Sequence, residues 1–386
     1  MSLNQDFLPH IVIDIGSSTI KCGYNEEGCP RIIIPNVWGT YKSNLINVIG
    51  DKNKVYYGND ALLNAPNLDL NYYQIGHNGK FPTNGADYER FEGMFKYIFE
   101  QGLKVKQKDY KVFLIDSIFT STKERVMLSK ILFEKLEVCQ IHIEPQSIMS
   151  LYSTAKQSGL IIDSGEIYTS IVPIYEGFVI SKGVEISPIA GKELTNQFMR
   201  HHKTEFDNNN VCTQYEMAKR IKEKYSEILL DNNEKEKNSE KLEFCLPDGN
   251  KIEIKNERFD IPELIFNPSN MGGSDLKGIQ ELILDSIGKA DLMVRTELLN
   301  SIILSGGNCL IKGYKERLKL ETEKIIAKSE FAKNTVKIGT QNEIKFAAWA
   351  GASGICSFGN FRDKWISKSD YEEHGPQIFE QNYIFG

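Results

Sequence analysis

The segment that begins at His10 is repeated in outline at Gly159. The first copy is HIVIDIGSSTIKCGYN followed by RIIIPN, and the second is GLIIDSGEIYTSIVPIY followed by FVISKGVEI. Each copy has an apolar run that ends in Asp-x-Gly, and two further runs rich in β-branched residues follow it. Such runs separated by tight turns are typical of a three-stranded meander. We therefore expect two structurally related halves.

Both halves continue with strand and helix patterns in alternation. In the first half, strands are expected at 111–115 and 138–143, and helices at 122–136 and 147–157. In the second half, strands are expected at 301–304 and 336–339, and helices at 279–287, 313–325 and 344–357. This alternation favours an α/β fold with mixed sheets. Two such lobes would enclose a cleft.

Two stretches interrupt this pattern and are interpreted as insertions. The small lobe then has its core at 1–35, 79–153 and 347–386, with an insertion at 36–78. The large lobe has its core at 154–189 and 276–346, with an insertion at 190–275. The second insertion contains a hairpin at 246–249 and a charged run at 231–241, which we expect to be a solvated loop.

Composition excludes several classes of protein. The formal charge of the 386 residues is -6, which removes the electrostatic basis for general nucleic-acid binding. The seven cysteines include no Cys-x-x-Cys pair, so reduced thiols are expected. The first residues lack the pattern of a secretory leader, and no apolar run approaches the roughly 18 residues of a membrane helix. We expect a cytosolic or nuclear chain without membrane contact.

The Asp-x-Gly turns suit the binding of polyphosphate. Glycine lets the backbone approach, and the N–H groups of such a turn converge on anionic oxygens. Asp14 and Asp163 would repel phosphate unless a divalent cation lies between them. Ser17, Ser18 and Lys21 add donors. A single such turn is common in hairpins, so the prediction of a metal–nucleotide clamp depends on there being two.

A third glycine turn follows an apolar strand at 302–307, where missing side chains would admit a base or a sugar. The chain has no GxxxxGK[ST] motif, so it is not a P-loop protein. The phosphates would instead be held by the hairpin turns.

Several segments resemble the actin family, within the superfamily that also contains sugar kinases and heat-shock chaperones. They are VPIYEGF at Val172 to Phe178, LPDG at Leu246 to Gly249, NERF at Asn256 to Phe259, LSGG at Leu304 to Gly307 and WISKSDYEEHGP at Trp365 to Pro376. The resemblance covers nearly the whole chain, and the last segment is particular to actins and actin-related proteins. It implies the actin-like ATPase fold, a ribonuclease H-like duplication with two lobes around a nucleotide cleft.

By this resemblance, the chain binds ATP or ADP with Mg²⁺. Magnesium would be surrounded, through water, by Asp14, Gln146 and Asp163. The phosphates would face Ser17, Ser18, Lys21, Gly165 and Glu166, while base and ribose would contact Lys222, Glu223, Gly307, Leu310, Ile311 and Lys345. Gly16, Gly191 and Gly306 complete the nucleotide-binding set. Gln146 matches the glutamine that helps to position the attacking water in actins.

The catalytic residues implied by the resemblance are Gln146, Asp163 and the residue at position 170, where this chain departs from the family. Ser170 stands in place of a histidine that is thought to assist proton transfer, and a hydroxyl cannot relay protons as an imidazole does near neutral pH. Ile167 and Ser18 replace phosphate-loop glycines. We therefore expect ATP binding with slow hydrolysis.

The segments that make filament contacts in actins also differ. The segment at 43–58 and the loop at 267–275 have different residues from those of actins. About six extra residues also precede position 85, and they prevent a match for His77 with the family's modified histidine. We expect a divergent actin-like cytoskeletal protein of the cytoplasm that acts by filament or complex assembly, with actin-like subunits or actin-binding proteins as partners.

Other functions stay open. A non-polymerising subunit of a motor-associated or chromatin complex, which would allow a nuclear location, is the main alternative. A small-substrate phosphotransferase and a chaperone ATPase are further alternatives, and the actin-specific tail argues against both.

Overall fold

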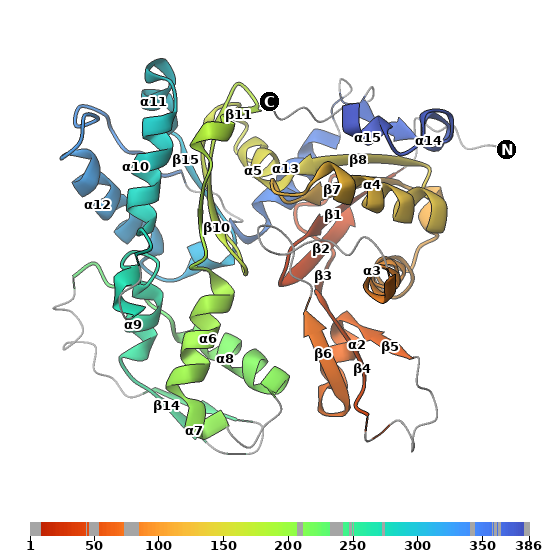
Figure 1. Cartoon of the computed structure of the whole chain (residues 1–386), viewed down its shortest axis with the longest axis horizontal. Helices are drawn as coiled ribbons and strands as arrows, with labels where there is room; N and C mark the ends of the chain where they lie inside the picture. The colour runs from red at the N-terminus through yellow and green to blue at the C-terminus, as the bar shows by residue number, and fades with distance from the viewer. Residues whose placement is uncertain are drawn as a thin grey trace. The chain divides into compact units, whose positions relative to one another are not determined.

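The computed structural model describes residues 9–43, 45, 54–72, 85–206, 211–231, 242–246, 249, 251–271, 275–339, 344–356, 358, 361 and 364–381. The chain forms two compact units (Figure 1). Unit 1 comprises residues 1–156 and 346–386, and unit 2 comprises residues 157–345. Both units contain sheets and helices, which confirms the expected α/β class. The finer partition into lobe cores and insertions stays a prediction.

Unit 1 is built on a six-stranded sheet. Its strands are β1 (His10–Ile15), β2 (Thr19–Tyr24), β3 (Ile32–Pro35), β7 (Lys111–Asp116), β8 (Gln140–Pro145) and β16 (Ile366–Ser367), in the order β16-β8-β7-β1-β2-β3. The meander β1-β2-β3 is antiparallel, as expected, while β7 and β8 continue the sheet parallel to β1. The carboxyl ends of β1, β7 and β8 therefore meet at one edge.

Helices cover the two faces of this sheet. They are α3 (Gly85–Tyr97), α4 (Thr122–Lys130), α5 (Gln146–Tyr152), α13 (Ala347–Cys356), α14 (Lys368–His374) and α15 (Ile378–Gln381). Ile11 and Ile13 of β1 belong to the core cluster that includes residues of α3 and α4. Val12 faces the other way, because side chains alternate along a strand, and its carbonyl accepts a hydrogen bond from buried Trp349 of α13.

A small three-stranded sheet also belongs to unit 1. It has the order β5-β4-β6 and consists of β4 (Val37–Tyr41), β5 (Val55–Tyr57) and β6 (Leu68–Tyr72), with helix α2 (Gly58–Leu63). These strands lie in the segment interpreted as an insertion at 36–78. Most of the expected subunit-contact segment, and His77, lie outside the described residues.

Unit 2 repeats the meander and its parallel neighbour. Its sheet has the order β11-β10-β9-β15, with β12 also paired to β10, and consists of β9 (Gly159–Ser164), β10 (Thr169–Tyr175), β11 (Phe178–Val179), β12 (Glu185–Ser187) and β15 (Ile302–Ser305). The third strand of the meander is therefore divided into β11 and β12, with a 3₁₀ turn at Ser181–Gly183 between them.

The other elements of unit 2 surround this sheet. The helices are α6 (Gly191–His201), α7 (Lys203–Phe206), α8 (Val211–Tyr225), α9 (Glu257–Glu263), α10 (Ile279–Lys289), α11 (Leu292–Leu299) and α12 (Tyr314–Ile326). A hairpin of β13 (Leu242–Cys245) and β14 (Lys251–Ile254) lies where a hairpin was expected. The charged run beyond Asp231 lies outside the described residues.

Three expected elements differ from the structure. The strand at 336–339 is wrong, because Ile338 makes only an isolated parallel bridge to Ile302. The helix expected at 122–136 is α4 followed by a π-helical segment at Ile131–Lys135. The helix expected at 147–157 ends at Tyr152, and Ala155 beyond it has a φ of 54°, which no α-helix accommodates.

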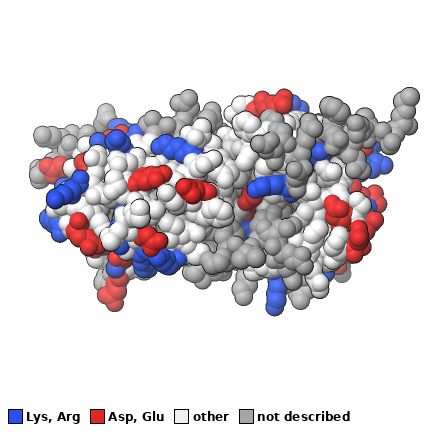
Figure 2. All heavy atoms as spheres, turned by 90° about the horizontal axis from the view of Figure 1, so that it is seen from above, with Lys and Arg blue, Asp and Glu red and all other residues white. Residues whose placement is uncertain are grey.

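No described helix is long and apolar enough to cross a membrane. On the face shown in Figure 2, the described Lys and Arg side chains lie among Asp and Glu side chains, and neither sign forms a broad field there.

Helices α5 and α13 pack closely in unit 1, and Gly351 makes this approach feasible. A Cβ added at Gly351 would lie 1.8 Å from the carbonyl oxygen of Met149, whereas one added at Gly354 of the same helix would meet no atom within 4 Å. The missing side chain at Gly351 is therefore a packing requirement.

Replacing Gly351 with Ala should destabilise the protein by about 1–3 kcal/mol, because the extra methyl group forces α5 and α13 apart. The matched change Gly354→Ala should stabilise it by about 0.5–1 kcal/mol, because alanine favours a helix over glycine. Urea unfolding of the three proteins measures both effects. Two changes of the same sign would contradict this account of the helix pair.

Candidate functional site

The two Asp-x-Gly turns have the same backbone hydrogen bond. The N–H of Gly16 donates to the carbonyl of Thr19, and the N–H of Gly165 donates to the carbonyl of Tyr168, each over 3.2 Å. Each bond closes the connection between the first two strands of its meander. The duplication predicted from the sequence therefore extends to the geometry of the turns.

The aspartates at these turns are buried and have equivalent cross-strand neighbours. Asp14 is 4% exposed and lies opposite Lys21, while Asp163 is 7% exposed and lies opposite Ser170. The Nζ of Lys21 lies 2.6 Å from Oδ2 of Asp14. A cation thus balances the first carboxylate across its hairpin, whereas the neighbour across the second hairpin is a neutral hydroxyl, itself 1% exposed.

Asn36 supports the first turn and was not anticipated from the sequence. Its backbone N–H donates to Ser18 over 3.0 Å, and its side-chain amide donates to the carbonyl of Gly16 over 2.9 Å. The residue is fully buried, and its Oδ1 has no hydrogen-bond partner among the described atoms. In the sequence, the one indication of this role was that Asn36 is a polar residue between two apolar strands.

Gln146 is the first residue of α5, directly after β8. Because β1, β7 and β8 are parallel, Gln146 lies at the same edge of the sheet as Asp14, two strands away. The next residue, Ser147, is buried, and its Oγ has no hydrogen-bond partner among the described atoms. Within unit 1, the structure thus places Asp14 and Gln146, two of the three residues expected around magnesium, at one edge of the sheet.

In unit 2, Asn308 joins the second turn to the third glycine turn. Its side-chain amide donates to the carbonyl of Gly165 over 2.6 Å and to Oγ of Ser164 over 3.2 Å. Asn308 was also missed, although its position directly after Gly306 and Gly307 could have indicated it.

The two glycines of the third turn differ in the space available for a side chain. Gly306 has a φ of 89°, and a Cβ there would lie 2.3 Å from the carbonyl of Ser164. Gly306 is therefore required by packing against β9. A Cβ at Gly307 would meet no atom within 4 Å, so the space beside this exposed residue is open to a flat group.

Glu166 and Gly191 lie on the other side of the second turn. The N–H of Gly191 donates to the carbonyl of Gly165 over 3.0 Å, and the N–H of Lys192 donates to the carbonyl of Glu166 over 2.6 Å. The hydroxyl of Tyr215 on α8 donates to Oε1 of Glu166. Tyr215 is a third residue that the sequence did not indicate.

Burial changes the acidity of two side chains here. Lys222 is 4% exposed, and its Nζ donates to the carbonyl of Gly191 over 2.8 Å. Desolvation lowers the pKa of Lys222, although Glu166 opposes that shift. Burial, and then the charge of Glu166, raises the pKa of Tyr215, so its hydroxyl stays a donor.

The side chains of the remaining predicted residues do not take part in the hydrogen bonds described above. Ser17 and Ser18 lie in the first turn and are partly exposed. Ile311 packs against the core of unit 2. Glu223, Leu310 and Lys345 are exposed, and the hydrogen bonds described above do not include their side chains.

Comparison with known proteins gives one consistent answer. The family model Actin matches residues 5–383. An "Actin-like protein" of Neurospora crassa is 28% identical over 381 residues, which cover 97% of each chain. The actin-type fold expected from the sequence is thereby confirmed. The chain belongs to the actin family.

Proposed function

We propose that this protein binds Mg-ATP through the turns at Gly16 and Gly165 and hydrolyses it slowly. The nucleotide would act mainly as a conformational ligand that controls assembly with actin-like subunits or actin-binding proteins in the cytoplasmic cytoskeleton. The observation that carries this proposal is the pair of equivalent turns, each with a buried aspartate at the end of the preceding strand.

The described residues fit a magnesium nucleotide. The carboxylates of Asp14 and Asp163 and the amide oxygen of Gln146 are of the kind that Mg²⁺ takes, directly or through its waters. Asn36 Oδ1 and Ser147 Oγ are buried polar atoms without a hydrogen-bond partner among the described residues, and ordered water or a ligand would satisfy them. The open space beside Gly307 supports the assignment of the base or ribose to that turn.

Slow hydrolysis is supported by the environment of Ser170. This hydroxyl lies opposite Asp163 in the hairpin, at the position equivalent to Lys21 in unit 1. Neither a hydroxyl nor a lysine ammonium exchanges protons readily near pH 7. Neither hairpin therefore has a proton carrier opposite its aspartate.

Exposed apolar side chains support a role in assembly. Phe178, Leu292 and Met293 of unit 2 are 79%, 76% and 94% exposed, and the last two begin α11 directly after the ion pair of Lys182 with Asp291. Exposed apolar side chains of this size are favourable to bury against another protein. A filament or a larger complex would provide such a surface.

Replacing Asp163 with Asn should weaken ATP binding in Mg²⁺ by about 10- to 100-fold, the range found when groups that support a metal from its outer shell are removed. The loss should disappear in EDTA, because the carboxylate acts through the metal. Titration with a fluorescent ATP analogue measures both conditions. Asp291→Asn, an exposed aspartate of the same unit, is the matched control and should bind ATP normally. Equal affinity of wild type and Asp163→Asn in Mg²⁺ would refute the assignment.

Replacing Ser170 with His should raise the rate of ATP hydrolysis by about tenfold or more, because a positioned imidazole contributes about 10²- to 10⁴-fold as a general acid or base. Ser170→Ala should leave the slow rate unchanged. Phosphate release from saturated protein measures the rate, and thermal unfolding checks that the buried position accepts the larger ring. A wild-type rate equal to that of an ordinary actin, with no gain in Ser170→His, would overturn the proposal of slow hydrolysis.

Sedimentation with ATP and Mg²⁺, followed by electron microscopy, tests the mode of assembly. Because the segments that make contacts in ordinary actin filaments differ here, we expect few double-stranded filaments of the ordinary kind. Met293→Ser should reduce whatever assembly occurs, since it removes an exposed apolar contact. Abundant ordinary filaments that Met293→Ser leaves unchanged would contradict both expectations.

A further inference from the structure

Two histidines and a glutamate of unit 2 form a cluster that includes no residue of the nucleotide turns. His201 is the last residue of α6, His202 follows it, and Glu257 is the first residue of α9. The Nε2 of His202 lies 3.0 Å from Oε1 of Glu257, and the Nε2 of His201 lies 3.6 Å from Oε2. Each carboxylate oxygen is thus faced by a different imidazole.

These separations match those of ligands on one ion. Zinc binds histidine nitrogen at about 2.0–2.1 Å and carboxylate oxygen at about 2.0–2.2 Å in tetrahedral geometry, so two ligand atoms on one zinc ion lie about 3.3–3.5 Å apart. The two observed distances lie on either side of this value. One ligand atom from each of the three residues can be chosen so that all lie within 4.8 Å of one another. Small side-chain adjustments would therefore complete the geometry.

A buried hydrogen-bonded pair alone would not need this arrangement. The side chains of His202 and Glu257 are 4% and 2% exposed, and the hydrogen bond between them would by itself satisfy a structural role. The His201 side chain is 55% exposed, yet its Nε2 lies close to the second oxygen of the same buried carboxylate. The position of His201 therefore distinguishes a metal site from a hydrogen-bonded pair of His202 and Glu257.

The backbone holds these ligands in place. The N–H of Lys255 donates to Oε1 of Glu257 over 2.9 Å, which orients the carboxylate. The N–H of His202 donates to the carbonyl of Phe198, so the chain is still anchored to α6 at that residue. Hydrogen bonds that fix a ligand in this way raise the affinity of a metal site.

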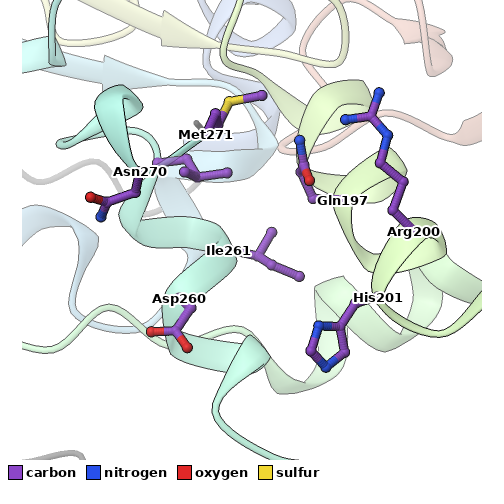
Figure 3. A pocket seen from close by; sticks show the side chains of 8 residues that line it. Gln197, Arg200, His201, Asp260, Ile261, Asn270 and Met271 are labelled. Atoms are coloured by element: carbon purple, nitrogen blue, oxygen red, sulfur yellow. The ribbon is translucent and has the colours of Figure 1, made fainter. Parts of the chain in front are cut away.

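The site reaches solvent at His201, whose side chain is 55% exposed. His201 lines a pocket of about 660 Å³ together with Gln197, Arg200 and Asp260, among others. Figure 3 shows His201 on α6 and Asp260 on α9 at the same end of this pocket. An ion can therefore arrive from solvent, and water can occupy a coordination position on the exposed side.

We propose that His201, His202 and Glu257 form a zinc site that fastens α6 to α9 and keeps one coordination position for solvent. Two imidazoles and one carboxylate suit Zn²⁺, whereas Mg²⁺ and Ca²⁺ prefer ligands that are all oxygen. This proposal does not depend on ATP binding.

Zinc titration of zinc-free protein against a chromophoric chelator tests the site, at a fixed saturating concentration of Mg-ATP. Wild type should bind one equivalent of zinc, and His201→Ala should bind it at least about tenfold more weakly, because an exposed ligand has been lost. His374→Ala, which removes an exposed histidine of unit 1, should bind zinc as wild type does. All three proteins keep the same cysteines, so zinc held by thiols does not distinguish them.

Thermal unfolding provides a second measurement. Zinc should raise the Tm of wild type and of His374→Ala more than that of His201→Ala, since a ligand that binds the folded state stabilises it. His201→Gln, which keeps a polar side chain, should behave as His201→Ala does if the imidazole is the ligand. Absence of a bound equivalent in wild type, or equal zinc affinity in wild type and His201→Ala, would overturn the proposal.

Discussion

One backbone hydrogen bond, formed once in each unit, determines where the candidate site lies. The N–H of a glycine donates to the carbonyl three residues later, and this closes the hairpin directly after an aspartate-bearing strand. The aspartate is then fixed at the carboxyl end of a strand whose other neighbour is parallel, β7 in unit 1 and β15 in unit 2. Side chains at the ends of those parallel strands, or in the turns that follow, must lie near the same edge. Gln146 after β8 and Asn308 after β15 are the examples.

The two turns share a backbone geometry, but the residue opposite the aspartate differs in charge between them. Across the hairpin from its aspartate, unit 1 has Lys21 and unit 2 has Ser170, at equivalent positions of the strand register. Lys21 lies 2.6 Å from the Asp14 carboxylate and so offsets its charge, whereas Ser170 brings no charge. The second turn is instead held by Asn308, Gly191 and, through Glu166, Tyr215. One backbone geometry thus supports two different electrostatic environments.

The sequence predicted the parts of this arrangement that depend on local pattern. Apolar runs and Asp-x-Gly turns located both meanders, while Gly191 and Lys222 were named only through the resemblance to actins, and their contact with nucleotide stays a prediction. Asn36, Asn308 and Tyr215 were not predictable, because their roles depend on carbonyl or carboxylate groups 20, 143 and 49 residues away. The strand expected at 336–339 failed for a related reason. Its apolar residues were evident, but whether such a run forms a ladder or a single bridge to Ile302 depends on the sheet edge that it meets.

Helix α6 joins the two groups of polar residues described in unit 2. Its first residue, Gly191, donates to the carbonyl of Gly165 in the second turn, and its last residue is His201. A Cβ at Gly191 would lie 2.5 Å from Oε2 of Glu166, so this end of the helix approaches the second turn closely. Its eleven residues span about 16 Å, and the helix packs against α8 and α9. The second turn and the proposed zinc site therefore lie at the two ends of one packed helix. For this reason the zinc titration keeps the nucleotide concentration constant, so that a difference between variants reflects zinc binding alone.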